Sequence, residues 1–184
     1  ITARAMNGEI EFEPALRERV ALLAGLPASV VEDVIARRIT LTPGGIELVR
    51  TMRSNGYFTA LVSGGFTVFT GPIGDRIGFD VHRAKILQEE DGRLSGKVAP
   101  PLHGKQAKVD SLVAFCRMLD ITPLDAIAVG DGANDLGMIQ LAGSGVALHA
   151  KPTVAAQARI RIDHADLTAL LYLQGYRRTD FVSD

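Results

Sequence analysis

Two carboxylates and an amide fall within the six residues Gly130-Asp131-Gly132-Ala133-Asn134-Asp135. The apolar run 126–129 precedes them and a helical pattern follows, so they are expected in a turn at the carboxyl end of a buried strand. Open α/β sheets bind their ligands at that end. Two carboxylates this close repel each other unless a positive group lies beside them. A magnesium ion could be that group, because Mg2+ binds oxygen ligands from one or two carboxylates, water and phosphate. The alternative is a plain turn in which Asn134 or Asp135 caps the helix, although a cap needs only one such residue.

A second polar turn, Ser63-Gly64-Gly65, follows the apolar run 57–62. A hydroxyl and backbone N–H groups in a glycine turn before a helix can bind an anion, although many such sequences are ordinary turns. Lys108 begins the helical pattern that leads into the strand before Asp131, and Lys105 is a weaker candidate for the same position. A lysine there would neutralise phosphate as a point charge, the alternative being a solvated residue on the helix surface. These residues together predict phosphoryl-transfer chemistry.

The chain shows no evident nucleophile for this chemistry. Ser63 has no base partner in the pattern, and Cys116 falls in an amphipathic helical stretch, which indicates a buried apolar role. The histidines have neither metal-ligand spacing nor a triad pattern and are interpreted as surface or core residues; they are His82, His103, His149 and His164.

Size and charge restrict the function further. The chain has 184 residues and a formal net charge of −1, from 20 basic and 21 acidic residues. This balance provides no field that would attract nucleic acid or an anionic membrane. We find no apolar run of membrane-spanning length and no signal-peptide pattern at the start. The single cysteine excludes an internal disulfide, which fits a cytoplasmic protein.

Strand and helix patterns alternate from residue 42 onward, which predicts an α/β core with a parallel sheet flanked by helices. We assign residues 41–184 to this core and residues 1–40 to a small helical cap. Thr42-Pro43 is expected to start a helix as N-cap and first residue, and Pro72 is expected to kink or interrupt a later helix. Residues 81–99 are predicted to form a hairpin with Asp91-Gly92 as its turn.

The polar residues also carry a family resemblance. Ser63-Gly64-Gly65-Phe66, Lys108 and the stretch 130–135 resemble, in order and spacing, motifs two, three and four of the haloacid dehalogenase superfamily. Residues 6–12 and 16–19 narrow the resemblance to its phosphoserine phosphatases, over nearly the whole chain, and imply a Rossmann-like core. That family opens with a strand ending in Asp-x-Asp-x-Thr, whose first Asp attacks phosphorus and whose second is the general acid and base. No such motif occurs here, so the nucleophile is expected upstream and this chain alone is expected to be inactive.

The resemblance implies a cytoplasmic enzyme of serine biosynthesis that hydrolyses L-3-phosphoserine through an aspartyl-phosphate and uses Mg2+. It implies that Asp131 is a metal ligand. It also implies that Asp135 lies in the second shell, where it holds metal-bound water or orients Lys108. Lys108 would neutralise the phosphate and the nucleophile.

The resemblance also implies a substrate-binding set, which is Met6, Phe12, Arg19, Ser63, Gly64, Lys108 and Asn134. Arg19 would pair with the substrate carboxylate, and Met6 and Phe12 would cover the site. From the residues alone, Arg19 is better interpreted as a surface charge on a helix, and Met6 and Phe12 as part of the cap core; the resemblance favours the site roles.

Two other functions stay open. Without the nucleophile, the chain could be a non-catalytic module that binds phosphate or phosphoserine. Alternatively, it could belong to a phosphatase or phosphotransferase for another small phosphomonoester such as phosphohomoserine. Under each reading the partner is a small phosphorylated molecule, not nucleic acid or a membrane, and a homodimer is compatible with the resemblance.

Overall fold

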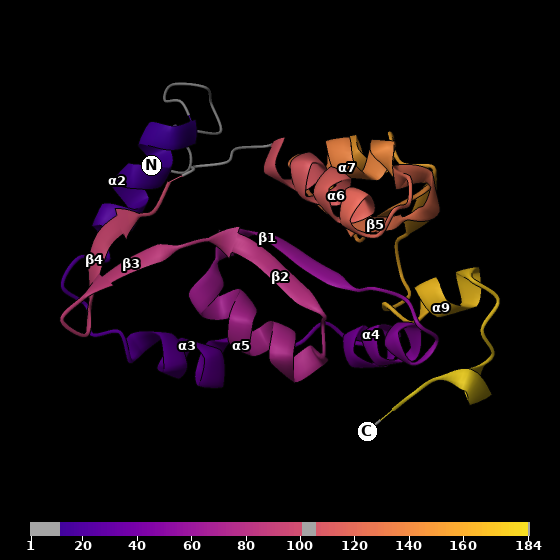
Figure 1. The fold of residues 1–184 in the computed structure, drawn as a ribbon, viewed down its shortest axis with the longest axis horizontal. Helices are drawn as coiled ribbons and strands as arrows, with labels where there is room; N and C mark the ends of the chain where they lie inside the picture. Colours follow the sequence, from indigo (N-terminus) through magenta and orange to yellow (C-terminus); the bar gives the residue numbers. More distant parts are fainter. Residues whose placement is uncertain (1–11, 101–105, 184) are drawn as a thin grey trace. The chain divides into compact units, whose positions relative to one another are not determined.

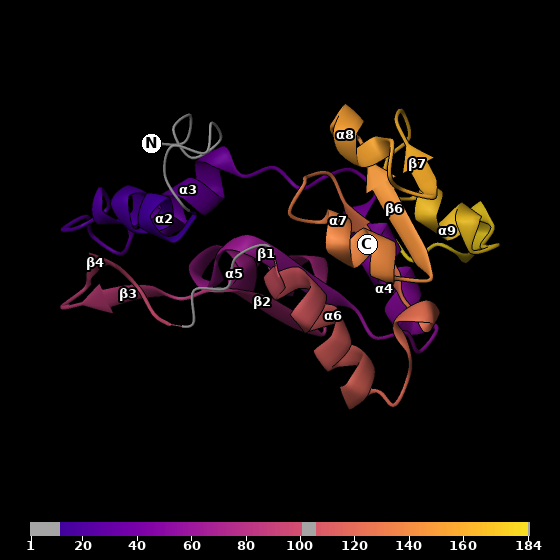
Figure 2. The same ribbon diagram turned by 90° about the horizontal axis from the view of Figure 1, so that it is seen from above.

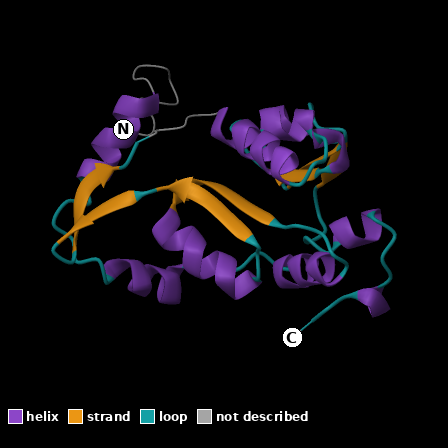
Figure 3. Cartoon of the chain, viewed as in Figure 1, coloured by secondary structure: helices purple, strands orange, loops and turns teal. Residues whose placement is uncertain are grey.

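The computed structural model describes residues 12–100 and 106–183 and shows helices and strands alternating along most of the chain (Figures 1 and 3). The chain divides into two compact units, which we treat separately. Of the described residues, the first unit comprises 12–40, 60–76 and 81–100, and the second comprises 41–59, 77–80 and 106–183. In the part that the structure describes, no helix is long and apolar enough to cross a membrane.

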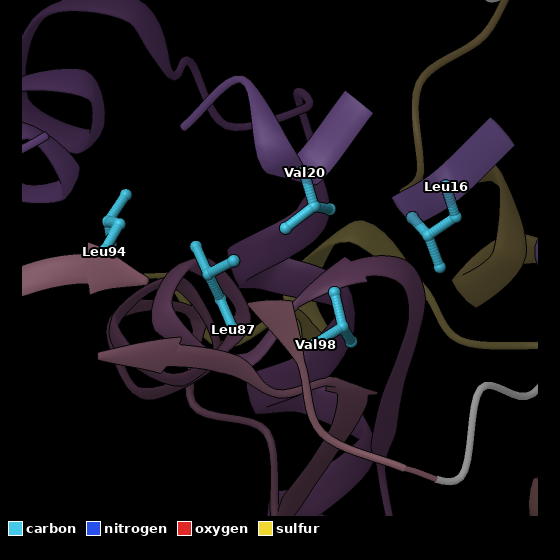
Figure 4. Packing of buried hydrophobic residues seen from close by; sticks show 5 residues of the cluster. All are labelled: Leu16, Val20, Leu87, Leu94 and Val98. Atoms are coloured by element: carbon cyan, nitrogen blue, oxygen red, sulfur yellow. The ribbon is translucent and has the colours of Figure 1, made fainter. Parts of the chain in front are cut away.

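One half of the first unit packs two helices with a β-hairpin. The helices are α2 (Phe12–Ala21) and α3 (Val30–Arg38), and the hairpin strands are β3 (Leu87–Glu90) and β4 (Arg93–Val98). Apolar side chains of α2 and of both strands converge on one buried core (Figure 4), made of Leu16, Val20, Leu87, Leu94 and Val98. The predicted turn Asp91-Gly92 is confirmed, since both residues have positive φ, 50° and 71°, as a tight hairpin turn requires.

The other half of the first unit is a parallel strand pair with a helix. The strands are β1 (Ala60–Phe66) and β2 (Val81–Lys85), and α5 (Thr67–Ile77) connects them. The apolar run 57–62 was expected to end before the Ser63 turn, but β1 begins later and continues through it to Phe66. The prediction that residues 81–99 form only a hairpin was also wrong, because residues 81–85 pair with β1. Helix α5 continues through Pro72, so the expected interruption is absent.

The second unit is built on a three-stranded parallel sheet. Its strands are β5 (Ile127–Gly130), β6 (Ser144–Leu148) and β7 (Ile160–Ile162), with β6 in the centre. Its helices are α4 (Gly45–Ser54), α6 (Gln106–Met118), α7 (Leu136–Leu141), α8 (Pro152–Ala155) and α9 (Ala169–Leu173), with 3-10 turns at Pro123–Asp125 and Arg178–Asp180. Figure 2 shows β6 and β7 side by side, with α8 between them in the chain. Val146 and Ala147 of the central strand are almost completely buried.

Helix α4 starts later than Thr42-Pro43 predicts. Its N-cap is Gly44, which has a φ of 77°, and a Cβ there would lie 2.7 Å from the Thr168 backbone nitrogen. Close packing against the segment before α9 therefore sets the start of the helix. Further along α4, the buried Thr51 hydroxyl accepts the Val182 N–H at 2.9 Å. This hydrogen bond holds the segment after α9 against α4.

A polar network joins the end of α4 to residues 77–80. One carboxylate oxygen of Asp80 accepts the Thr59 N–H at 2.8 Å and the Thr59 hydroxyl at 2.9 Å, and the other pairs with Arg53 Nε at 2.8 Å. Burial alone would raise the pKa of Asp80, but these hydrogen bonds and the Arg53 charge outweigh it and lower the pKa. The network therefore contributes more to stability while Asp80 is ionised.

Candidate active site

The second unit places the Asp131 turn between β5 and α7. Strand β5 ends at Gly130, which pairs with Ala147 of the central strand, and the turn follows at the carboxyl end of the sheet. A Cβ at position 130 would overlap the Asp135 side chain, and one at position 132 would lie 2.5 Å from Asn134 Oδ1. Glycine is therefore required at position 130 so that the turn can fold back over Asp135, whereas at position 132 the exposed Asn134 side chain could move aside.

Asp135 organises this turn from inside. Its side chain is 3% exposed, and its Oδ1 is hydrogen-bonded and paired with the Lys108 ammonium group of α6. Its Oδ2 accepts the backbone N–H groups of Asp131 at 3.1 Å and Gly132 at 2.9 Å. Burial would raise the pKa of Asp135, but the Lys108 hydrogen bond and charge and the two N–H donors outweigh it and lower the pKa.

These contacts answer the helix-cap alternative. Asp135 is the N-cap residue of α7 by position, but its side chain makes no capping hydrogen bond. It points back to the turn and to Lys108, 27 residues earlier in the chain. The two carboxylates therefore have different surroundings, and Lys108 is the positive group beside the buried one.

Asp131 is the residue of this turn that could hold a metal. Within residues 12–100 and 106–183, no hydrogen bond or ion pair to its exposed carboxylate is found, whereas both oxygens of Asp135 are already used. The same residues contain no group of three or more His, Cys, Asp or Glu side chains that could hold an ion. One free carboxylate fits Mg2+, which keeps several waters and binds through one or two carboxylates and a substrate phosphate.

The first unit holds the other predicted turn, within β1. The Gly65 N–H donates to Ser63 Oγ at 3.0 Å, and Lys85 Nζ of β2 donates to the Gly64 carbonyl at 2.6 Å. Gly64 is exposed and Ser63 half-buried, and α5 begins directly after β1. Lys85 was missed in the sequence because nothing local links it to a turn 21 residues earlier.

The structure describes only some of the other residues that were predicted to bind the substrate. Asn134 is exposed in the Asp131 turn, and Arg19 is exposed in the last turn of α2. Phe12 begins α2, but its side chain lies outside the described part, as do Met6 and Lys105. The roles of these residues, like those of the two turns, stay predictions.

The cysteine and two of the histidines lie in surroundings that do not suit catalysis. Cys116 is buried in α6, and burial followed by the Asp125 charge raises the pKa of its thiol, which opposes thiolate formation. His82 Nδ1 is 3.0 Å from the buried Thr70 hydroxyl, and His149 Nε2 is 2.8 Å from the Ala165 carbonyl. These contacts agree with structural roles.

Comparison with known proteins shows which family and which proteins the chain resembles. Residues 3–140 match the family model described as haloacid dehalogenase-like hydrolase. Phosphoserine phosphatase of Streptomyces coelicolor is 43% identical over 98% of this chain and 44% of its own length. Its counterpart in Polaromonas sp. is 43% identical over 94% of the chain and 75% of its own length.

Two solved structures are also similar. A probable phosphoserine phosphatase from Vibrio cholerae in unliganded form has a TM-score of 0.89 at 37% identity, covering 95% of this chain and 54% of that one. A phospho-aspartyl intermediate analogue of phosphoserine phosphatase has a TM-score of 0.82 at 39% identity. The match covers 94% of this chain and 82% of that one. The chain spans about half the length of two of these proteins, those of Streptomyces coelicolor and Vibrio cholerae.

The family model and the similar relatives define a hydrolase class: the chain belongs to the haloacid dehalogenase-like hydrolase family. Within that family, the relatives named above are phosphoserine phosphatases. Both the recognised superfamily and the predicted α/β fold are thereby confirmed.

Proposed function

We propose that this chain carries phosphate- and metal-binding residues of a Mg2+-dependent phosphoserine phosphatase, which hydrolyses L-phosphoserine to L-serine and phosphate. The observation that carries the proposal is the Lys108–Asp135–Asp131 arrangement, in which one carboxylate is buried and neutralised while the other has no partner among the residues that the structure describes. The named function of the relatives supports the choice of substrate.

In the second unit, Asp131 would hold Mg2+, which when bound would neutralise phosphoryl oxygens and so favour attack at phosphorus. Lys108 is directed at the turn through its pair with Asp135, and its ammonium group would also lie beside the bound phosphate. Asp135 fixes the position of the Lys108 ammonium group, so this positive charge needs no reorganisation when negative charge develops on the phosphate. Asn134 is exposed beside them and would hydrogen-bond the substrate or its water.

In the first unit, the Ser63 hydroxyl would donate to a phosphoryl oxygen. Since Ser63 Oγ already accepts the Gly65 N–H, its own hydrogen remains available to an outside acceptor. Arg19 would pair with the carboxylate of the substrate, and this pair would separate phosphoserine from phosphomonoesters that lack a carboxylate.

The proposal is tested on the complete protein by measuring phosphate release from L-phosphoserine with Mg2+, with and without EDTA. Asp131→Asn should abolish release, and Lys108→Ala should lower it on the order of a hundredfold or more, as for other preorganised charges. Arg19→Ala should reduce discrimination between phosphoserine and substrates without a carboxylate. Near-normal release by either of the first two variants would refute the site, and unchanged discrimination would point to another phosphomonoester.

A second candidate function is binding without turnover. The same residues would support it, because Lys108 and the Ser63 turn could bind a phosphate without supplying a nucleophile. Steady phosphate release by these residues alone would exclude this candidate. Phosphoserine binding that depends on Ser63 and Lys108 but gives no release would favour it.

A further inference from the structure

The Ser63 turn is a bulge in the β1–β2 pair. Val62 aligns with Arg83, but the next aligned residues are Phe66 and Lys85, so a four-residue step on β1 faces a two-residue step on β2. The register shift leaves residues 63–65 outside the regular ladder of this strand pair. Their backbone groups must therefore be held by other donors and acceptors.

Lys85 supplies one of these contacts. Its Nζ donates to the Gly64 carbonyl at 2.6 Å, and it lies on the adjacent strand at the residue where pairing with β1 resumes. The Gly64 carbonyl and the Gly65 N–H belong to the same peptide plane and point in opposite directions. Whatever holds the carbonyl therefore also aims the N–H.

That N–H is directed at Ser63 Oγ, 3.0 Å away. A hydroxyl that accepts a hydrogen bond in this way keeps its own hydrogen for another acceptor. If the peptide plane rotated, the hydroxyl would lose this fixed partner and could turn its hydrogen elsewhere. The orientation of the Ser63 hydroxyl thus depends on a lysine that is 22 residues away in sequence.

We propose that Lys85 is a positioning residue for the Ser63 turn. Its ammonium group holds the Gly64–Gly65 peptide so that the Ser63 hydroxyl donates to a phosphoryl oxygen, and it adds a positive charge beside that anion. The inference rests on the proposed function, in which the Ser63 turn binds phosphate. It extends that function to a residue on the neighbouring strand.

The test uses inorganic phosphate as the probe and the full chain as the protein. Lys85→Met removes the ammonium group at similar length, whereas Lys85→Arg keeps a charged donor. Lys97→Met is the matched control, since Lys97 lies in the same unit on β4, is 67% exposed, and is 3.6 Å from Glu90. Binding is followed through the amide NMR signals of Gly64 and Gly65, and hydrogen exchange of the Gly65 amide is measured without phosphate.

We expect Lys85→Met to raise the Kd for phosphate about tenfold, as loss of a charge-assisted hydrogen bond implies. It should also speed exchange of the Gly65 amide. Lys85→Arg and Lys97→Met should stay within about threefold of the wild type. Recovery by arginine separates positioning from a general loss of structure, because both substitutions change the packing of the lysine stem.

Two results would overturn the inference in distinguishable ways. If the wild type binds phosphate and Lys85→Met binds it equally well, Lys85 has no positioning role, while the proposed function stands. If the wild type does not bind phosphate, the phosphate role of the Ser63 turn fails together with the inference. If Lys85→Met does not fold, Lys85→Gln is used in its place. Equal phosphate affinity in Lys85→Gln, Lys85→Arg and the wild type would then overturn the role of Lys85.

Discussion

Asp135→Asn isolates the buried charge that organises the Asp131 turn. The amide oxygen of asparagine can still accept the Asp131 and Gly132 N–H groups, as Oδ2 does now. The other side-chain atom becomes an NH2 donor facing the Lys108 ammonium group, so a charge-assisted bond is replaced by two opposed donors. The substitution changes charge with almost no change in volume.

The expected cost follows from the burial of the pair. Removing one partner of a fully buried ion pair costs about 3–5 kcal/mol, and a hydrogen bond to a charged group contributes about 1.5–3 kcal/mol. Lys108 keeps 16% of its side-chain exposure, so water recovers part of the loss. We therefore expect the free energy of unfolding to fall by about 2 kcal/mol, which corresponds to a fall in Tm of about 4–8 °C for a chain of this size.

Urea unfolding followed by far-UV circular dichroism measures this change, and hydrogen exchange of a peptide spanning residues 127–141 assigns it to the turn. Asp131→Asn is the matched control, because the Asp131 carboxylate is exposed and unpaired among the described residues. It should alter stability by less than about 0.5 kcal/mol while removing activity. Equal destabilisation by the two substitutions, or a cost below about 0.5 kcal/mol for Asp135→Asn, would refute the reasoning.

Two further predictions concern stability. Because the pKa of Asp80 is lowered in the folded protein, its contribution is present above the ordinary carboxyl pKa of about 3.9 and is lost as pH falls through the lower folded pKa. Asp80→Asn should therefore lower the urea midpoint at pH 6 and much less near pH 2, and an equal effect at both would contradict this linkage. Gly96→Ala should cost about 2–4 kcal/mol, because its φ is 73° and the new Cβ would lie 2.8 Å from Ala24 Cβ. Gly92 has a φ of 71°, but nothing lies within 4 Å of an added Cβ, so Gly92→Ala should cost only about 1–2 kcal/mol in the same denaturation assay. Equal costs for the two substitutions would exclude a contribution from the contact with Ala24.

Sequence reasoning succeeded where local patterns decide the structure. The apolar run before Gly130 predicted β5, and Asp91-Gly92 predicted the hairpin turn, because these signals act over a few residues. The polar turn at the carboxyl end of β5 was predicted for the same reason.

Long-range contacts explain what sequence could not supply. The start of α4 depends on the packing of Gly44 against residues before α9. The segment of β2, which contains Arg83 and Lys85, has a weak strand signal, and its pairing with β1 makes it a strand nevertheless. The different states of Asp131 and Asp135 depend on Lys108, from a separate helix. Spacing alone shows that carboxylates are close, but not which of them is already neutralised.

The bond between Val182 and Thr51 bears on how the chain acquires its structure during translation. These residues are 131 positions apart, so a ribosome delivers α4 well before its partner segment exists. Until then, one side of α4 must remain incompletely covered in the nascent chain, and closing so large a loop slows the final step. The segment around Val182 is therefore the later-made part of this contact, and removing it should lengthen the time that the nascent polypeptide is open to proteases and chaperones.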